Sequence, residues 1–273
     1  MTKTVLITGA SSGIGKAAAL FFASKGWNVA ATMRNPEREK DITVYSSVCL
    51  LQLDVCDETS IRKAVEDTLR VFGKIDVLVN NAGYGTLGVF EYSTTENVRN
   101  QLETNVVGLM SVTRAVLPYF RKQKGGTIIN LASIAGKVGF PLFSVYNSSK
   151  FAVEGFSEAL RYEVERFGVR VKIVEPGPIK TDFYTRSMDF FGDGDIADYN
   201  ALEGVVKKNI VNMGLQSGGP DVVARTIYRA AVSRSKRLRY PVGGGAPFIV
   251  AAKRFLPDCV MRGAIRLMLG IRR

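Results

Sequence analysis

A strand pattern, a glycine-rich turn and a helix pattern follow one another at the start of the chain, and they constrain the fold more than any other feature. Residues 4–8 read TVLIT, and TGASSGIG spans Thr8 to Gly15. Gly9, Gly13 and Gly15 allow a sharp turn and close approach of the backbone to a diphosphate. The following helix adds amides and a positive dipole end at its N-terminus. The other turn residues expected to face a bound nucleotide are Ser11, Ser12 and Ile14.

Apolar runs alternate with helix-period segments along the rest of the chain. The apolar runs are rich in Val, Ile and Leu without polar alternation, as is typical of strands buried on both faces. We expect strands at Thr4–Thr8, Asn28–Thr32, Cys49–Asp54, Val77–Asn80, Thr127–Ala132, Arg170–Glu175 and Leu238–Val242. We expect helices at Gly13–Lys25, Glu58–Phe72, Thr95–Lys122, Tyr146–Phe167, Asp198–Met213 and Pro220–Ser233. The pattern predicts an α/β fold, a doubly wound parallel sheet of about seven strands with helices on both faces.

The length of 273 residues suits one large domain. We expect a single Rossmann-type domain over residues 1–247, with residues 248–273 as a basic helical extension of it. The stretch Phe183–Asp198 is the least regular and is expected to be a mobile loop carrying a short helix. No apolar run reaches the roughly 18 residues that span a bilayer. An immediate first strand leaves no room for a signal peptide, and three cysteines without a CxxC pair favour the cytoplasm.

The chain contains no histidine. This excludes a Ser-His-Asp hydrolase, a Cys-His protease and any zinc site built from histidine, and we expect no metal. It also removes the side chain that ordinarily titrates near neutral pH. Acid-base chemistry would therefore need a Tyr, Lys, Asp, Glu or Cys with a perturbed pKa.

Tyr146 and Lys150 stand four residues apart in SVYNSSK. One helical turn separates them, so the phenol and the ammonium share a helix face. A neighbouring ammonium stabilises the phenolate and lowers the tyrosine pKa from its usual value of about 10. Such a tyrosine could exchange a proton with an alcohol oxygen. The alternative is an ordinary surface pair.

Six motifs occur in an order that resembles the short-chain dehydrogenase/reductase family, over Thr4 to about Phe183. TGASSGIG matches the TGxxxGxG of that family, NNAG at Asn80–Gly83 matches its signature after the fourth strand, and PGPIKT at Pro176–Thr181 matches the segment that lines the nicotinamide. The positions that match its catalytic tetrad are Asn105, Ser133, Tyr146 and Lys150. The resemblance implies an oxidoreductase that interconverts alcohols and carbonyls with a nicotinamide cofactor.

The resemblance also implies a role for each tetrad residue. Tyr146 would be the general acid or base, and Lys150 would lower its pKa and hydrogen-bond the nicotinamide ribose. Ser133 would hold the substrate oxygen. Asn105 would anchor a water that links Lys150 to solvent. Donors aimed at the developing negative charge on oxygen are what hydride addition to a carbonyl requires.

Further cofactor contacts follow from the matched motifs. Asp54 and Val55 fit the adenine-binding position of the family. Asn80 is expected to stabilise the central strand. The other residues expected to border the cofactor are Asn81, Ala82, Gly83, Pro176, Gly177, Ile179 and Thr181.

The second strand and its continuation, NVAATMRNPE, bear on the choice between the two nicotinamide cofactors. Dinucleotide folds use an acid at the end of this strand to bind the adenosine ribose 2′-hydroxyl. Thr32 stands where we expect that acid, and Arg34 follows. A guanidinium pairs with a 2′-phosphate, which an acid would repel. NADP(H) is therefore favoured over NAD(H), unless Arg34 is only a solvated loop charge.

The loops after the later strands supply apolar side chains that favour a bulky apolar small-molecule substrate, unless they only pack a lid against the core. These residues are Val138, Phe140, Leu142, Phe143, Phe183, Tyr184, Phe190 and Phe191. The segments ATMRN and VEPGPIKTDF resemble the retinol and 17β-hydroxysteroid dehydrogenase branch. Two alternatives remain open, a reductase of carrier-bound 3-oxoacyl groups and a non-catalytic NADP(H)-binding sensor.

The net charge of +12 is concentrated near the C-terminus. Residues 225–273 contain twelve Lys and Arg and one acid, which gives +11 and leaves +1 for residues 1–224. From Asp258 the chain is expected to form a short amphipathic helix. This region could contact an anionic membrane surface weakly, attract an acidic carrier protein or face solvent, and no nucleic-acid motif accompanies it. The resemblance implies a homodimer or homotetramer built on Thr95–Lys122 and Tyr146–Phe167.

Overall fold

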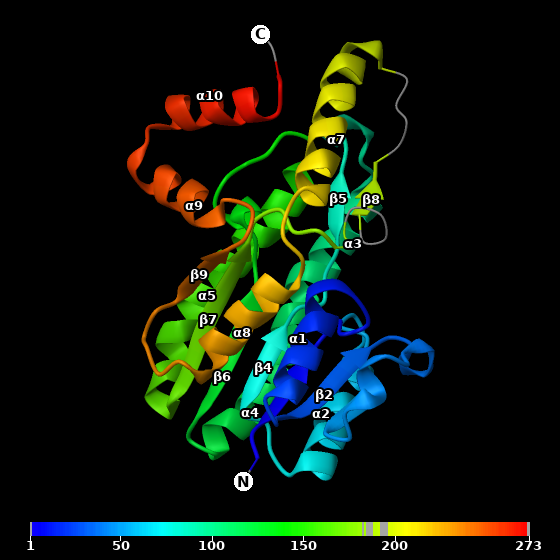
Figure 1. Ribbon diagram of the computed structural model, residues 1–273, viewed down its shortest axis with the longest axis vertical. Coiled ribbons are helices and arrows are strands. Elements are labelled where there is room, and N and C mark those ends of the chain that lie inside the picture. The colour runs from blue at the N-terminus through cyan, green and yellow to red at the C-terminus, as the bar shows by residue number, and fades with distance from the viewer. Residues whose placement is uncertain (1, 182, 184–187, 192–195, 272–273) are drawn as a thin grey trace.

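Seven parallel strands form the central sheet of the computed structural model, which describes residues 2–181, 183, 188–191 and 196–271 (Figure 1). Their order is β3-β2-β1-β4-β6-β7-β9, and every neighbouring pair is parallel. The strands are β1 (Thr4–Ile7), β2 (Asn28–Met33), β3 (Val48–Gln52), β4 (Val77–Asn80), β6 (Gly126–Leu131), β7 (Val169–Pro176) and β9 (Arg239–Val242). The predicted doubly wound sheet is confirmed.

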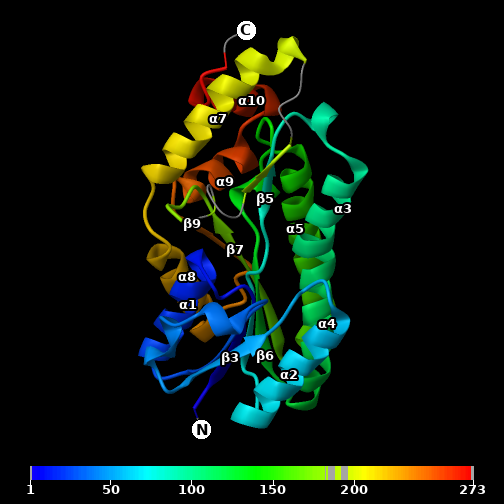
Figure 2. The same ribbon diagram turned by 90° about the vertical axis from the view of Figure 1, so that its right-hand side faces the viewer.

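Helices cover both faces of the sheet, as Figure 2 shows in an edge-on view. On one face lie α1 (Gly13–Ser24) and α8 (Asp221–Val232). On the other lie α2 (Glu58–Phe72), α4 (Leu109–Lys122) and α5 (Ser144–Val164). Each face buries its own apolar core, which explains why the central strands lack polar alternation.

The predicted helix Thr95–Lys122 is interrupted. It comprises α3 (Thr95–Leu102), a π-helical turn (Glu103–Gly108) and α4. A Cβ on Gly108 would lie 2.8 Å from a methyl of Val55, so the wide turn packs directly against the loop after β3. A π-turn inserts one residue without a change in the apolar periodicity on either side, so the sequence pattern did not reveal it.

A second layer of structure lies beyond one end of the sheet (Figure 1). It contains a two-stranded parallel sheet of β5 (Gly85–Leu87) and β8 (Met188–Phe190). Its helices are α7 (Asn200–Leu215), α9 (Ala246–Phe255) and α10 (Asp258–Met268). Helix α10 begins at the predicted residue, and α9 lies almost entirely within the predicted helical extension, whereas β5 and β8 were not predicted.

The expected mobile loop Phe183–Asp198 is wrong at Met188–Phe190, which form β8, because backbone pairing with β5 orders these residues. Residues 184–187 and 192–195 of this stretch, Tyr184 among them, lie outside the described residues. Within the described part of the chain, no helix has the length and apolar character needed to cross a membrane.

A buried ionic cluster joins β7 and β9 to α5. Glu175, near the end of β7, has no exposed surface, and Glu154 of α5 is nearly as buried. The Arg239 Nε atom lies 2.9 Å from Glu154 Oε2 and 3.7 Å from Glu175 Oε1, and Lys137 Nζ lies 3.3 Å from Glu154 Oε2. Burial, with the Glu154 charge next, raises the pKa of Glu175 to about 8. Protonated Glu175 can then donate a hydrogen bond to Glu154.

This cluster predicts a pH-dependent stability. Glu175 holds a proton in the folded state that an unfolded glutamate, with a pKa near 4.5, releases. Its stabilising contribution is complete below pH 4.5 and is lost as the pH rises through about 8. Glu175→Gln keeps a donor that does not titrate. We therefore expect its unfolding free energy, measured by urea denaturation from pH 5 to 9, to fall less with pH than that of the wild type. Exposed Glu66→Gln is the matched control, and equal slopes for wild type and Glu175→Gln would contradict the prediction.

Candidate active site

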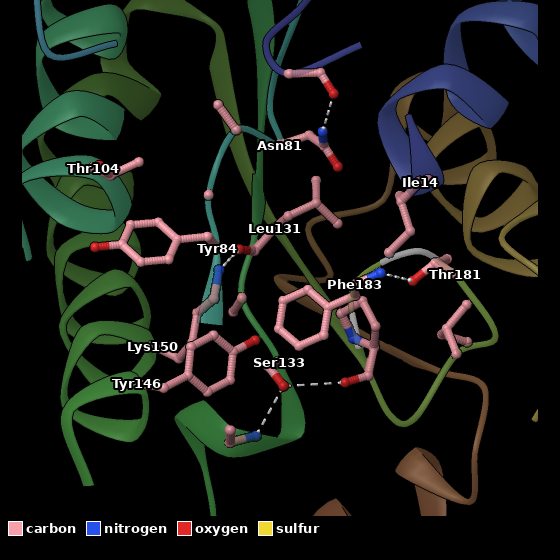
Figure 3. Close-up of a pocket in the computed structure, with 18 of the residues that line it drawn as sticks. Ile14, Asn81, Tyr84, Thr104, Leu131, Ser133, Tyr146, Lys150, Thr181 and Phe183 are labelled. Carbon is pink, nitrogen blue, oxygen red and sulfur yellow. Dashed lines mark hydrogen bonds between the residues drawn. The ribbon is translucent and has the colours of Figure 1, made fainter. Parts of the chain in front are cut away.

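A cavity of about 640 Å³ lies where the parallel strands end and the strand order reverses, between β1 and β4 (Figure 3). Ligands of open α/β sheets bind at this position. Most of the residues predicted from the sequence line it: Gly9, Ser11, Ser12, Gly13, Ile14, Arg34, Asp54, Val55, Asn81, Ala82, Gly83, Ser133, Tyr146, Lys150, Pro176, Gly177, Ile179 and Thr181. Gly15 and Asn105 are not part of the lining. Five of the six motifs identified in the sequence, all except the one at Asn105, thus meet around one cavity.

The glycine turn and the NNAG segment are locked together. The Asn81 Nδ2 group donates to the carbonyls of Thr8 and Gly9 at 2.9 and 3.0 Å. Gly9 has φ +67°, and a Cβ there would lie 2.8 Å from the Ala82 Cα. A Cβ on Gly15 would lie 2.2 Å from the Gly9 carbonyl oxygen. Gly9 and Gly15 therefore permit close backbone packing, and the predicted contact of Gly15 with the cofactor is replaced by this indirect role.

The first turn of α1 fits an anion. Its N-cap residue, Ser12, makes no side-chain capping hydrogen bond, so the first amides of the helix are not capped from within it. Gly13 adopts φ +52°, and a Cβ there would meet nothing closer than Thr181, at 3.8 Å. The backbone is therefore open toward the cavity. A diphosphate can approach these amides as it does at other helix N-termini.

Tyr146 and Lys150 line the cavity from α5, so they are not an outer surface pair (Figure 3). The Lys150 Nζ atom lies 5.7 Å from the centroid of the Tyr146 ring and donates to the Leu131 carbonyl at 2.9 Å. Burial lowers the pKa of Lys150 to about 8. Phe143 and Phe183 flank the tyrosine ring, with centroid distances of 5.7 and 5.9 Å. The phenol thus lies among aromatic rings beside a buried ammonium.

Ser133 follows β6 and faces the same cavity. Its Oγ accepts from the Ala135 amide at 3.1 Å and donates to the Pro176 carbonyl at 3.4 Å. Figure 3 shows the Ser133 hydroxyl beside the phenol of Tyr146. The long donated bond leaves this hydroxyl able to turn toward another acceptor.

Asn105 lies in the π-turn, and it does not line the cavity. Its Nδ2 donates to the Tyr84 carbonyl at 2.8 Å and to Ser149 Oγ at 3.1 Å, while its Oδ1 accepts from the Tyr84 amide at 3.0 Å. A Cβ on Gly83 would lie 2.9 Å from Oδ1. The Asn105 side chain therefore fastens the end of the NNAG segment to α5.

The adenosine end requires one correction. Thr32 is buried within the sheet, where its Oγ1 donates to the Ile7 carbonyl at 3.0 Å. Met33, the last residue of β2, lines the cavity instead, and so does the exposed Arg34. Met33 therefore faces the cavity and Thr32 does not, because side chains alternate along the strand. Neither residue is an acid, so the argument from Arg34 is unaffected.

The substrate end matches the sequence prediction only in part. Phe140, Phe143 and Phe183 line the cavity, whereas Val138, Leu142 and Phe191 are buried elsewhere and Phe190 is exposed. Sequence reasoning missed the lining residues Met33, Leu53, Cys56, Tyr84, Thr104, Leu131, Ala132, Ile134, Ala135, Asp189, Ile210, Met213, Ile249, Met268 and Leu269. The last five come from α7, α9 and the end of α10. Their helix-period pattern predicts a packed face and gives no sign of a cavity.

These residues fit a nicotinamide dinucleotide. The open helix terminus suits the diphosphate, and Asp54 and Arg34 line the end where the adenosine would lie. Lys150 donates to the Leu131 carbonyl, and an ammonium has three N–H groups. Further acceptors, such as ribose hydroxyls, can therefore be bound by Lys150.

Comparison with known proteins also indicates a nicotinamide-dependent oxidoreductase. The model of the short chain dehydrogenase family matches residues 3–190. The uncharacterized oxidoreductase YusZ of Bacillus subtilis is 40% identical over 93% of this chain and 94% of its own length. The 3-ketodihydrosphingosine reductase of Bacteroides thetaiotaomicron is 37% identical over 98% of each chain. Human retinol dehydrogenase 8 is 36% identical over 66% of this chain and 60% of its own length.

Solved structures share the fold and show both nicotinamide cofactors. A short-chain dehydrogenase from Streptomyces avermitilis has a TM-score of 0.86 and 33% identity, with complete coverage of both chains. ElxO with bound NADP has a TM-score of 0.75 and 30% identity over 91% of this chain and all of its own. A Burkholderia phymatum relative in complex with NAD has a TM-score of 0.79 and 25% identity over 93% of this chain and 92% of its own. This chain belongs to the short chain dehydrogenase family, resembles its retinol dehydrogenase branch and is an alcohol or carbonyl oxidoreductase that uses a nicotinamide cofactor.

Proposed function

We propose that this protein is an NADP(H)-dependent oxidoreductase that interconverts an alcohol and a carbonyl on a bulky apolar substrate, with Tyr146 as the general acid or base. The observation that carries the proposal is the meeting of Tyr146, Lys150 and Ser133 in the cavity that also contains the glycine turn. A non-catalytic sensor would not need a phenol, an ammonium and a hydroxyl gathered at one point.

Tyr146 handles the proton. In the reductive direction its Oη donates a proton to the carbonyl oxygen, and in the oxidative direction it accepts the proton of the alcohol. The bound nicotinamide supplies or accepts the hydride. The Ser133 hydroxyl holds the substrate oxygen beside the phenol, which makes a donor ready where negative charge develops.

Lys150 sets the acidity of the phenol. A positive charge beside Tyr146 favours the phenolate. Burial disfavours the charged form of Lys150 itself and lowers its pKa to about 8. The ammonium is still the main form at neutral pH. It can therefore assist Tyr146 and bind the nicotinamide ribose.

Asn105 is a positioning residue in this proposal. Its amide groups are used by Tyr84 and Ser149, so the water contact implied by the family resemblance would fall to its backbone carbonyl in the π-turn. The side chain keeps the NNAG segment at a fixed distance from α5. Both roles depend on the widened turn, which is a common feature of functional sites.

The substrate end of the cavity supports an apolar ligand. Its described walls include Phe140, Phe143, Ile210, Met213 and Leu269. The name of the Bacteroides relative supports the same class, because 3-ketodihydrosphingosine carries its carbonyl on a long alkyl chain. Reduction of carrier-bound 3-oxoacyl groups is the alternative. Oxidation of NADPH, followed with free ketones of increasing chain length and with one carrier thioester, distinguishes the two.

The cofactor preference rests on Arg34. Its side chain is exposed at the adenosine end of the cavity, and no acid stands at Thr32 or Met33. A guanidinium there can pair with a 2′-phosphate in two parallel hydrogen bonds.

Assembly and location complete the proposal. Helix α5 exposes Phe151 and Tyr162, and the π-turn exposes Val107, on the two predicted interface helices. We propose a homodimer, or a homotetramer, built on these faces. The free cysteines Cys49, Cys56 and Cys259 suit the cytoplasm, where thiols stay reduced.

Tyr146→Phe tests the catalytic assignment. The substitution removes the proton donor and little volume, so kcat should fall by about 10²- to 10⁴-fold, while the Kd for NADPH stays within a few-fold. Ketone-dependent NADPH oxidation gives kcat, and NADPH fluorescence gives Kd. Tyr162→Phe, an exposed tyrosine on the same helix, is the matched control and should behave as the wild type. A Tyr146→Phe variant that keeps more than a few per cent of the activity would remove Tyr146 from this role.

Arg34→Asp tests the cofactor preference. The carboxylate repels a 2′-phosphate and can accept the ribose hydroxyl, so the ratio of kcat/KM for NADPH to that for NADH should fall by at least about tenfold. Arg34→Lys keeps the charge and should retain most of the preference. An unchanged ratio in Arg34→Asp would show that Arg34 only faces solvent.

Phe151→Asp tests the interface. A carboxylate on the exposed face of α5 should weaken association, so that sedimentation velocity at micromolar concentration shows more monomer than for the wild type. Val44→Asp changes an equally apolar residue far from these helices and should leave the distribution unchanged. A wild type that is monomeric at this concentration would refute the proposed assembly.

A further inference from the structure

Two consecutive helices near the C-terminus each expose an apolar stripe. On α9, Phe248 is 85% exposed and Phe255 is 79% exposed, and they stand seven residues apart on one helix face. On α10, Val260 is 48% exposed and Leu267 is 84% exposed, again seven residues apart. Phe248, Leu267 and Phe255 are more exposed than any other large apolar side chain among the described residues. Soluble monomers rarely expose apolar side chains in such a group.

The inner faces of the same helices are already occupied. Ala246 and Met261 are buried, and Ile249, Met268 and Leu269 line the cavity. The stripes therefore remain after the helices have packed, so the protein does not need them for its own core. Figure 1 shows α9 and α10 at the outer edge of the molecule, on the side of the second layer.

Positive charge accompanies the stripes. Residues 246–273 contain Lys and Arg at six positions and one acid, Asp258, which gives +5. Asp258 is paired with Lys253, whereas Arg254 and Arg262 are exposed. Two such surfaces on two copies of the chain would repel each other. An apolar stripe bordered by arginine suits an anionic lipid surface, into which the apolar side chains enter while the cations contact the headgroups.

We propose that α9 and α10 together form a docking surface for an anionic membrane, with Phe248, Phe255, Val260 and Leu267 entering the headgroup region. The surface also continues into the catalytic cavity. Met268 follows Leu267, is 38% exposed and lines the cavity. An apolar substrate dissolved in the bilayer can therefore reach the cavity beneath α10. This second step rests on the proposed function, whereas the docking does not.

Sedimentation with vesicles tests the docking. The full chain is mixed with vesicles of phosphatidylcholine alone or with 30% phosphatidylglycerol, at low and at 0.5 M salt. We expect binding to the anionic vesicles at low salt, with at least tenfold weaker partitioning to neutral vesicles and at high salt. Phe255→Asp with Leu267→Asp, and separately Arg254→Glu with Arg262→Glu, should each weaken binding at least tenfold. Val71→Asp changes an exposed apolar residue on α2 and should bind as the wild type.

Three results would overturn the docking: recovery of the wild type in the supernatant with both kinds of vesicle, unchanged binding by both double variants, or a loss of dimers in Phe255→Asp with Leu267→Asp, which would make the stripes a contact between copies. Tyr146→Phe should bind vesicles as the wild type, so failure of the proposed catalysis is seen separately.

For the second step, anionic vesicles should raise kcat/KM at least threefold for a long-chain ketone and not for a short, water-soluble one. Equal effects on both ketones would refute delivery from the bilayer.

Discussion

The side-chain amides of Asn80 and Asn81, at the reversal of the strand order, hold the site together. Asn80 Nδ2 donates to Asn130 Oδ1 and to Thr113 Oγ1, both at 2.9 Å, and thereby joins β4 to β6 and α4. Asn81 joins β4 to the glycine turn after β1. Asn80 is buried and Asn81 is half-buried, and their hydrogen bonds to three other segments permit little displacement of the three strand ends. The glycine turn after β1 and the cavity residue Ser133 after β6 therefore keep a fixed separation.

Helix α5 carries two charged groups one turn apart, Lys150 at the cavity and Glu154 deep within the fold. Lys150 lies beside Tyr146 and has a lowered pKa, whereas Glu154 belongs to the cluster that contains Glu175, whose pKa is raised. Burial causes both shifts, because it disfavours the charged form of either group. The cost is tolerated where the ionised groups gain partners, a backbone carbonyl for Lys150 and Arg239 for Glu154. The same burial thus makes the fold sensitive to pH at Glu175 and lowers the pKa of the ammonium beside the phenol at Lys150.

The second layer has two surfaces with different roles. Its inner side chains close the substrate end of the cavity, and its outer ones are the apolar stripes of α9 and α10. A helix has about 3.6 residues per turn, so one short helix can serve both surfaces at once. Leu267 on the outer stripe and Met268 on the cavity wall are adjacent in the sequence. The end of α10 therefore belongs both to the exposed apolar stripe and to the cavity wall.

The sequence by itself determined the seven-stranded sheet, the positions of most helices and many of the residues that line the cavity around the glycine turn. Strands buried on both faces need continuous apolar runs, and a diphosphate turn needs glycine at fixed spacing, so these features are local. Only the tertiary structure decided that Met33 and not Thr32 faces the cavity, that a π-turn places Asn105, and that α7, α9 and α10 close the substrate end. Each depends on contacts between segments distant in the chain, and apolar side chains at helical spacing give no indication of whether they will meet a core, a cavity or a lipid surface.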